Sequence, residues 1–456
     1  MCSLVVVVMA AGRGTRMKSD VPKVLHHLGG QTILESVVAA AVDLQPRQVV
    51  VIYGYGGEQV PDVCGHLPVT WIRQEEQLGT GHAVTQAVPE IANSDTVLIL
   101  VGDMPLIRSS TLELVVEAAS GDSIGLVTVN LDDPDGYGRV VRDKSGKVLS
   151  IVEQRDATQS QLMINEVNAG IFALSGRRLK RWLLSLGCDN TQGEYYLTDI
   201  IGFAVEEGVE VKTVQASKAH EVTGINDRSQ LAVAERRYQL GRVRELMMQG
   251  VTFRDPARAD LRGNVSVGRD VTIDVNVILE GDVTLGDRVL VGPNTVIRDS
   301  VLESDVEILA NCVIERSHVG SGSRIGPFAR LRPDSELAKD VQVGNFVEVK
   351  KSTIGPGSKV NHLSYVGDAE IGAQVNVGAG TITCNYDGSN KHKTVIGDGA
   401  FVGSGTELVA PVEIGSEAII GAGSTITKNA EPGSLTLSRT RQTTIANWKK
   451  TSKSQR

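Results

Sequence analysis

Apolar residues return at every sixth position through much of the C-terminal half of the chain. One run of this ladder, which continues in similar runs to Ile426, is Leu261, Val267, Ile273, Leu279, Leu285, Val291 and Ile297. Six residues advance an α-helix by about 240°, so these side chains would not share a helical face, whereas on strands they point to one side. The period predicts a hexapeptide solenoid, an all-β parallel β-helix of about nine coils.

The N-terminal half has a different pattern, in which short apolar runs alternate with stretches of helical character. The apolar runs cover residues 4–9, 49–52, 96–101 and 124–129. This alternation predicts an α/β domain with a doubly wound, Rossmann-like and mostly parallel sheet. Such sheets bind ligands at the carboxyl ends of their strands, and Gly12, Gly54, Gly79 and Asp103 fall at those ends.

A helix is predicted between the two halves, after the capping pair Asn226-Asp227 and before Gly250. We therefore expect an α/β domain at 1–226, a helical linker at 227–250 and a β-helix domain at 251–456. The linker is interpreted as a rigid arm between two active sites. The alternative is an ordinary surface helix of the first domain.

Composition narrows the classes of function. A net charge of −8 over 456 residues argues against a nucleic-acid partner. No segment is apolar and long enough to span a bilayer, which argues against a membrane partner. The five cysteines are scattered and lack metal-ligand spacing, as expected of a protein in a reducing cytoplasm. We therefore expect a cytoplasmic protein that acts on small molecules.

A loop of small residues, AAGRGTRM, follows the first predicted strand. Such a loop presents backbone N–H groups to phosphates, and Arg16 and Lys23 would neutralise a triphosphate. The loop fits neither the Walker pattern nor the dinucleotide fingerprint, and the alternative is a turn that binds nothing. Asp103 leaves the strand at 96–101 and is suited to Mg²⁺, although an aspartate there can also cap a turn.

The solenoid carries an unusual polar cluster in the segments RLRP, NFVEVKK and NHLSY. Residues about 18 positions apart meet on stacked coils, so we expect Arg332 and Lys350 to align as a cationic ledge for a sugar phosphate. A lone histidine is more often structural, but beside Lys350 and Tyr365 we interpret His362 as a general base. Glu348 is a candidate for raising the basicity of the His362 imidazole.

The ladder is interrupted at 381–393, where TITCNYDGSNKHK predicts a protruding loop. A long loop on a regular scaffold is often functional. This loop follows His362 by about one coil, so we expect it to belong to the same site.

Several motifs together resemble those of a known family. The segments AAGRGTRM-x5-PK, EQLGTGHA, VGDMPL, DGYGR, IVEQRDA, VNAG and QGEYYLTDI are similar to those of sugar-1-phosphate nucleotidyltransferases. With the hexapeptide array behind them, they resemble the bifunctional family of N-acetylglucosamine-1-phosphate uridyltransferases / glucosamine-1-phosphate N-acetyltransferases. The resemblance implies left-handed coils, a homotrimer and small-molecule substrates.

The same resemblance implies two reactions. Acetyl-CoA acetylates glucosamine 1-phosphate, and UTP with Mg²⁺ then converts N-acetylglucosamine 1-phosphate to UDP-N-acetylglucosamine and pyrophosphate. The product would feed the synthesis of peptidoglycan and lipopolysaccharide precursors.

For the uridylyl transfer, the resemblance implies a nucleotide, a sugar and a metal site. The nucleotide would contact Met9, Ala10, Ala11, Gly12, Lys23, Gln74, Gly79, Thr80, Val101, Gly102 and Asp103. The sugar would contact Gly138, Glu153 and Asn168, and Asn226 would complete the Mg²⁺ site with Asp103. The chain departs from the family pattern at Ala169, where threonine is frequent, and at Val101, where an aromatic residue is common.

For the acetyl transfer, the resemblance implies that His362 is the general base. Arg332 and Lys350 would hold the sugar phosphate, and Tyr365 and Asn376 would hold the sugar. Acetyl-CoA would contact Ala379, Asn385, Tyr386, Ser404, Ala422 and Arg439.

Two alternative functions belong to other classes. One is a nucleotidyltransferase for another sugar or nucleotide, with the β-helix only as a trimerising scaffold. The segment EQLGTGHA and the cluster around His362 argue against it. The other is a non-catalytic trimeric assembly protein, which the presence of Lys23, Asp103, Asn226 and His362 makes a poor explanation.

Overall fold

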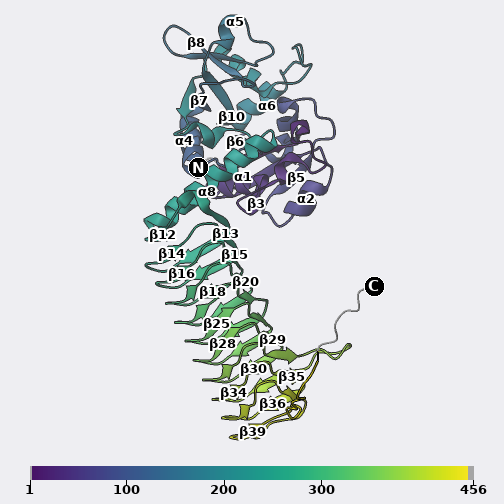
Figure 1. The fold of residues 1–456 in the computed structure, drawn as a ribbon. Helices are drawn as coiled ribbons and strands as arrows, with labels where there is room; N and C mark the ends of the chain where they lie inside the picture. The colour runs from purple at the N-terminus through teal and green to yellow at the C-terminus, as the bar shows by residue number, and fades with distance from the viewer. Residues whose placement is uncertain (1–2, 450–456) are drawn as a thin grey trace, which may run out of the picture. The chain divides into compact units, whose positions relative to one another are not determined.

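The computed structural model describes residues 3–449 (Figure 1). The chain forms two compact units that divide between Tyr238 and Gln239. This point lies inside helix α8 (Arg228–Met248), which confirms the helix predicted before Gly250. The assignment of 227–250 as a separate linker stays a prediction.

The first unit is built on a nine-stranded sheet whose main path runs β11-β7-β10-β6-β1-β4-β5. Strand β10 is antiparallel to both of its neighbours, and the other strands on this path pair in parallel. The four predicted strands are confirmed as β1, β4, β6 and β7. The strands of the path are β1 (Leu4–Ala10), β4 (Gln48–Tyr53), β5 (Thr70–Arg73), β6 (Thr96–Val101), β7 (Ile124–Asn130), β10 (Glu166–Ser175) and β11 (Val211–Gln215).

Helices cover both faces of this sheet, which confirms the doubly wound prediction. Val6 and Val8 of β1 pack on one side, in a core shared with α1 (Ile33–Val42) and α4 (Ser109–Ala118). Val5 and Val7 point to the other side, because successive residues of a strand alternate. That side is covered by α3 (Thr80–Gln86), α6 (Gly176–Leu183) and α7 (Ile200–Glu206). A hairpin of β8 (Arg139–Arg142) and β9 (Val148–Val152) pairs with β10.

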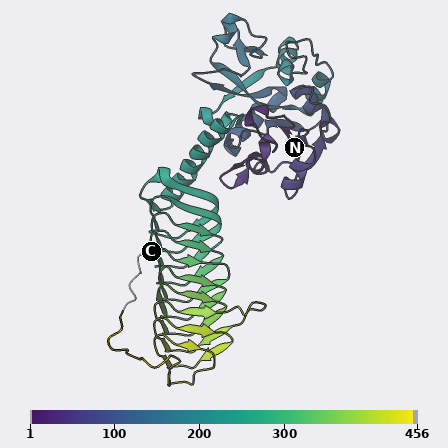
Figure 2. The ribbon, with the colours of Figure 1, turned by 45° about the vertical axis from the view of Figure 1, so that its right-hand side comes forward.

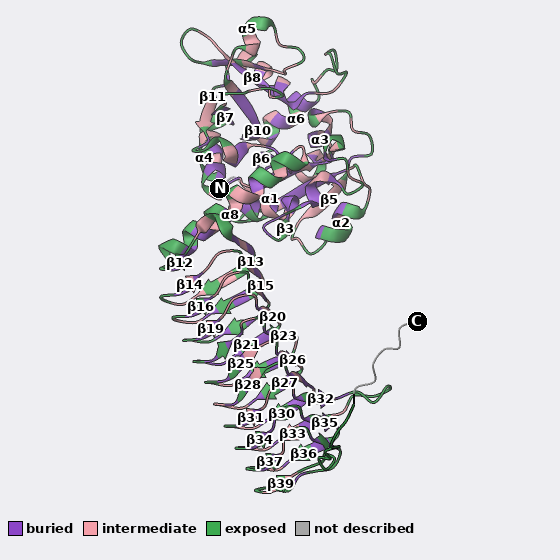
Figure 3. Ribbon diagram, in the orientation of Figure 1, coloured by how far each residue is buried: buried purple, intermediate pink, exposed green. Residues whose placement is uncertain are grey.

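The second unit is a parallel β-helix (Figure 2). One face is an 11-stranded sheet from β12 (Thr252–Phe253) to β39 (Leu435–Thr436), and a 17-stranded sheet follows the remaining faces. The ladder residues, for example Leu261, Ile273 and Leu279, are buried inside the coils. Figure 3 colours the ribbon by burial. The predicted solenoid is confirmed, and it extends beyond the predicted ladder at both ends. The left hand of the coils stays an implication of the resemblance.

The coils that bear the polar cluster are made of short strands. Their interior polar groups are paired: Ser364 donates to the His362 carbonyl at 2.8 Å and accepts from the Thr381 N–H at 3.3 Å. These bonds hold the turn after His362. The strands are β23 (Arg330–Leu331), β25 (Gln342–Asn345), β26 (Glu348–Lys350), β28 (Lys359–His362), β29 (Tyr365–Gly367), β31 (Asn376–Val377) and β32 (Ile382–Cys384).

The predicted loop leaves the stack between β32 and β33 (Thr394–Ile396), and its two sides meet where Tyr386 pairs with Lys391. Asp387 organises its tip by accepting from the Asn390 N–H at 2.7 Å and contacting His392 Nε2 at 2.7 Å. These partners hold the pKa of Asp387 well below its usual range. The loop is therefore ordered by its own hydrogen bonds.

Within residues 3–449, no helix combines the length and the apolar character needed to cross a membrane.

Candidate functional site

A cleft of about 560 Å³ lies at the carboxyl ends of β1, β5 and β6. Its lining joins the loop after β1 to segments that follow the neighbouring strands. Ten residues predicted for the nucleotide line it, namely Met9, Ala10, Ala11, Gly12, Lys23, Gln74, Gly79, Thr80, Val101 and Asp103. Arg13, Val24, Gln77, Ala83 and Glu194 also line it and were not predicted.

Two glycines allow the walls of this cleft to come together. Gly14 has a φ of 58°, and a Cβ there would lie 2.7 Å from Lys23 Cβ. Gly102 is buried, and its N–H donates to the Met9 carbonyl at 2.8 Å. A Cβ on Gly102 would lie only 3.0 Å from the same carbonyl. Gly102 therefore packs against the backbone at Met9 and does not line the cleft.

Lys23 joins the two residues predicted for the metal. Its Nζ lies 2.5 Å from Asp103 Oδ2 and 3.2 Å from Asn226 Oδ1. The Ile225 N–H donates to the Asp103 carbonyl at 2.9 Å, and Gly224 packs against the carboxylate, which brings Asn226 alongside. A carboxylate and an amide oxygen already share one cation, and both are oxygen donors of the kind that Mg²⁺ prefers. The residues present therefore fit the predicted metal.

These two oxygen donors would leave much of the Mg²⁺ shell to other ligands. In the described part of the chain, no group of three or more His, Cys, Asp and Glu side chains could hold a metal ion. Mg²⁺ usually keeps several waters and takes substrate phosphates as ligands, so a sparse protein donor set suits this ion.

The structure separates Arg16 from the cleft lining. Arg16 is exposed on the short helix η1 (Thr15–Met17), whereas Arg13 lines the cleft. Tyr137 was not predicted. Burial, and then the charge of nearby Asp103, raise the pKa of its phenol. The role of Arg16 stays a prediction.

The three residues predicted for the sugar come together. The Asn168 N–H donates to the Gly138 carbonyl at 2.9 Å, and a Cβ on Gly138 would lie 3.4 Å from Glu153 Oε1. Thr198 Oγ1 donates to the same Glu153 oxygen at 3.1 Å. Burial, with Asp199 as the strongest nearby negative charge, raises the pKa of Glu153.

Asn168 also connects this group to the cleft. Its Oδ1 accepts from the Gly170 N–H at 2.8 Å, and a Cβ on Gly170 would lie 3.2 Å from a methyl carbon of Val101. Val101 lines the cleft, so the sugar residues adjoin the nucleotide residues. Ala169 is buried between them and points into the core.

On the β-helix, one row of side chains follows the stacked coils with a regular charge pattern. In order it comprises Arg262, Glu280, Arg298, Glu315, Arg332 and Lys350. The charges alternate until Arg332, where a second cation follows instead of a carboxylate. The expected alignment of Arg332 with Lys350 is confirmed, and the excess positive charge suits a phosphate.

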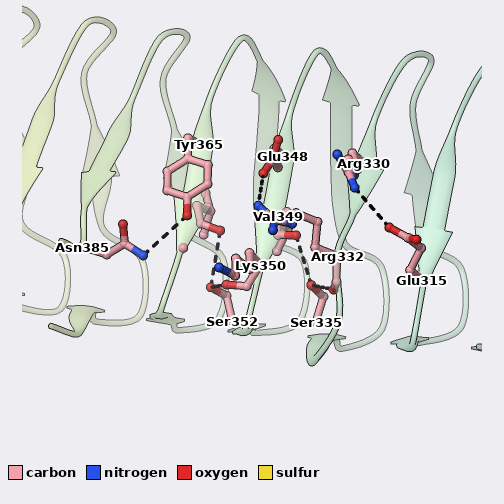
Figure 4. A network of polar contacts seen from close by, with 12 residues as sticks. Glu315, Arg330, Arg332, Ser335, Glu348, Val349, Lys350, Ser352, Tyr365 and Asn385 are labelled. Atoms are coloured by element: carbon pink, nitrogen blue, oxygen red, sulfur yellow. Dashed lines mark hydrogen bonds and ion pairs between the residues drawn. The ribbon is translucent and has the colours of Figure 1, made fainter. Parts of the chain in front are cut away.

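Two further residues shape this cationic ledge. Arg332 donates to Glu348 Oε1 at 2.8 Å (Figure 4). Lys391 of the protruding loop lies beside Lys350. Its side-chain hydrogen bond and then its charge, followed by the charge of Arg332, lower the pKa of Lys350. The sequence pointed to the loop but not to Lys391. A phosphate would relieve the repulsion among these cations.

His362 ends β28, and its Nδ1 lies 2.9 Å from Asn345 Oδ1 on the preceding coil. The two residues pair directly in the sheet register. Glu348 accepts from Arg332, and its effect on the imidazole stays a prediction. Asn345 was not predicted, and its spacing of one coil from His362 is the sequence signal for this contact.

The residues predicted for the amino sugar lie close to His362. Tyr365 Oη lies 3.5 Å from Asn385 Nδ2 (Figure 4). Asn385 Nδ2 also donates to Asp368 Oδ2 at 2.5 Å. A Cβ on Gly367 would lie 2.4 Å from Tyr365 Oη, so only glycine accommodates this ring position. Asn376 starts β31 one coil further on, on the same face as His362.

Three residues predicted for acetyl-CoA continue from His362 along one backbone ladder. The Gly380 N–H donates to the His362 carbonyl, Gly405 to Ala379, and Gly423 to Ser404, at 3.1, 2.7 and 2.8 Å. The Arg439 guanidinium then donates to the Ala422 carbonyl at 2.8 Å. Tyr386 lies on the protruding loop and is exposed.

Comparisons with known families match both units. A model described as a MobA-like NTP transferase domain matches residues 6–189. A GMPPB C-terminal domain model matches 261–362, and the bacterial transferase hexapeptide (six repeats) matches 393–428. A solved structure, a nucleotidyl transferase from Methanothermobacter thermautotroptrophicus, covers 54% of this chain and 98% of its own, with 22% identity and a TM-score of 0.37. That likeness is too weak to bear on the fold.

Full-length relatives are much more similar. The bifunctional protein GlmU of Methylococcus capsulatus is 57% identical over 99% of this chain and 98% of its own length. Those of Pseudomonas putida KT2440 and Acinetobacter baumannii AYE are 52% and 50% identical, each over 99% of both chains. The chain therefore belongs to the family of bifunctional GlmU proteins, which are acetyltransferases and uridyltransferases.

Proposed function

We propose that this enzyme makes UDP-N-acetylglucosamine in two successive transfers at separate sites. Residues 1–226 carry the uridylyl transfer, 251–456 carry the acetyl transfer, and 227–250 link them. What supports the proposal most directly is that one chain has both the cleft around Asp103 and the ledge around His362, together with full-length similarity to bifunctional relatives.

In the acetyl transfer, the amine of glucosamine 1-phosphate attacks the thioester carbonyl of acetyl-CoA. The new C–N bond replaces the C–S bond, and coenzyme A leaves as its thiol. An ammonium cannot attack, so the amine must first lose a proton, which His362 accepts at Nε2. If Nδ1 carries the ring hydrogen and donates to Asn345 Oδ1 at 2.9 Å, Nε2 is left free for this task.

In the uridylyl transfer, a phosphate oxygen of N-acetylglucosamine 1-phosphate attacks the α-phosphorus of UTP, and pyrophosphate leaves. Two anions must meet, so the protein contributes positioning and positive charge. Bound Mg²⁺, held by Asp103 and Asn226, would neutralise phosphate charge. Lys23 then turns to the phosphates, while Gly138, Glu153 and Asn168 hold the acceptor sugar.

We further propose that three copies associate through the β-helix in the cytoplasm. Exposed apolar side chains follow the corner beside His362: Phe328 stacks on Phe346 at 5.3 Å, and Leu363 stands on the next coil. Light scattering should give three times the 48.6 kDa of the chain. Phe346→Glu should lower that mass, and an unchanged wild-type mass of one chain would contradict the trimer.

Two single substitutions test the separation of the sites. His362→Gln should reduce release of coenzyme A from acetyl-CoA and glucosamine 1-phosphate by about a hundredfold or more and leave release of pyrophosphate unchanged. Asp103→Asn should have the reverse effect. If His362→Gln retained both reactions, the assignment of the general base would be wrong; if wild type lacked acetyl transfer, the β-helix would be only a scaffold.

A further inference from the structure

His82 lies between two glutamine side chains beside the nucleotide cleft. It belongs to α3, which begins at Thr80 of the predicted base-reading segment Gly79-Thr80. The Gln74 amide lies 2.8 Å from His82 Nδ1, and the atom nearest the ring is its Nε2. Gln86 Nε2 lies 3.2 Å from the other ring nitrogen, His82 Nε2. Gln74 is 2% exposed and lines the cleft, so the imidazole lies directly behind it.

These contacts cannot all use amide nitrogens. A neutral imidazole has one N–H and one acceptor nitrogen, so it cannot accept from an NH₂ group at both positions. One of the two glutamines must therefore present its carbonyl oxygen to the ring. The two ends of an amide have nearly the same shape, so hydrogen bonding decides which end faces which way.

The Gln86 amide is fixed by a second contact. Its Nε2 also lies 3.1 Å from the backbone carbonyl of His82, where an oxygen would be repelled. Gln86 therefore keeps its NH₂ toward His82 and donates to the ring Nε2. His82 Nδ1 then carries the hydrogen, and Gln74 must present Oε1 to it.

We infer that His82 is a positioning residue that holds Gln74 with its amide nitrogen toward the base and so selects uridine over cytidine nucleotides. This inference rests on the proposed uridylyl transfer. Uracil has a carbonyl oxygen at C4, which accepts a hydrogen bond, whereas cytosine has an amino group there. The Gln74 amide nitrogen can donate to the C4 oxygen of uracil. In cytosine it would face the C4 amino group, which is also a donor, so both groups would be buried without a hydrogen-bond partner.

The measurement is the ratio of kcat/KM for UTP to that for CTP, at one fixed pH for all variants. His82→Phe keeps a ring beside Tyr195, whose centroid lies 6.4 Å from that of His82, but frees the Gln74 amide to turn. The ratio should fall about tenfold or more, the effect of one hydrogen bond. A purely structural loss would lower both rates and leave the ratio unchanged.

Substitutions at Gln86 of opposite hydrogen-bonding character give the sharper comparison. Gln86→Glu can only accept, so it draws the ring hydrogen to Nε2, turns the Gln74 amide and lowers the ratio about tenfold. Gln86→Lys can only donate and should keep the ratio. His66→Phe is the matched control, because His66 contacts Glu35 and does not line the cleft. It should also keep the ratio.

Each outcome bears on a distinct statement. If wild type transfers no uridylyl group from UTP, the proposed function fails. If wild type prefers UTP and both His82→Phe and Gln86→Glu keep that preference, only the inference about His82 is overturned. If the UTP/CTP ratio fell in Gln86→Lys but not in Gln86→Glu, His82 would carry its hydrogen on Nε2, and the inference about His82 would also be overturned. If His82→Phe does not fold, the two Gln86 variants decide.

Discussion

At the scale of single residues, Gly367 leaves room for the Tyr365 ring on the β-helix. It occupies the coil position next to Lys350, and a Cβ there would lie 2.4 Å from Tyr365 Oη. Gly367→Ala should therefore displace the Tyr365 ring. We expect KM for glucosamine 1-phosphate to rise about tenfold, comparable with the loss of one polar contact. Pyrophosphate release by the same variant is the internal control, and an unchanged KM would contradict a sugar-binding role for Tyr365.

Glu153 gives a prediction about pH. Burial and then the charge of Asp199 raise its pKa, so the folded protein binds this proton more tightly than the unfolded chain. This group therefore lowers stability as pH rises through the ordinary glutamate range. Glu153→Gln retains an acceptor for Thr198 and removes that penalty.

Thermal unfolding should thus give a higher midpoint for Glu153→Gln than for wild type at about pH 7.5 and similar midpoints near pH 4. A lower midpoint at the higher pH would show that the folded protein stabilises the charged form of Glu153. The variant should also bind N-acetylglucosamine 1-phosphate more weakly.

The residue types along the chain were enough to predict the phosphate loop but not every side chain of the two candidate sites. Small residues after a buried strand were enough to predict the phosphate loop, because a close approach to the main chain needs them. Choosing between Arg13 and Arg16 required the turn at Gly14, whose φ of 58° redirects the chain. Asn345 was missed because a carboxylate was expected beside the imidazole, and the pairing of Glu348 with Arg332 depends on side-chain direction.

At the scale of elements, the row of charges on the β-helix departs from strict alternation at the predicted phosphate site. Opposite charges alternate from Arg262 to Arg332, and Lys350 breaks the order. Lys350→Glu should complete the alternation and leave the β-helix folded. It should also raise KM for glucosamine 1-phosphate about a hundredfold, because a charge-assisted bond to phosphate becomes a repulsion.

The matched control is Lys359→Glu, the same change on the neighbouring coil, three residues before His362. Lys359 is exposed on β28 and carries no predicted ligand contact. It should leave both reactions close to wild type. Equal effects of the two substitutions on KM would mean that general charge, and not the Lys350 site, governs binding.

The period of six identified the coils because each strand and corner repeats at nearly constant length. Four strands of the first unit, β1, β4, β6 and β7, were also predicted, since they are short apolar runs with buried neighbours. The antiparallel direction of β10 was not predicted. Direction depends on the hairpin that leads into β10, and pairing between distant segments leaves no local pattern.

At the scale of the whole molecule, the two reactions form a sequence. In the proposed function the product of acetyl transfer is the acceptor of uridylyl transfer, so the two sites together convert glucosamine 1-phosphate into a nucleotide sugar. In the proposed function the sites use different chemistry, a general base on one unit and charge neutralisation on the other. Each can therefore be removed by substitution without loss of the other, as the His362 and Asp103 variants test.

The most direct measurement is to incubate the purified chain with glucosamine 1-phosphate, acetyl-CoA, UTP and Mg²⁺ and to identify the nucleotide sugar by mass. We predict UDP-N-acetylglucosamine, formed only when acetyl-CoA and Mg²⁺ are both present. Formation only when N-acetylglucosamine 1-phosphate is supplied would contradict a catalytic β-helix and leave the chain a uridyltransferase with a structural solenoid.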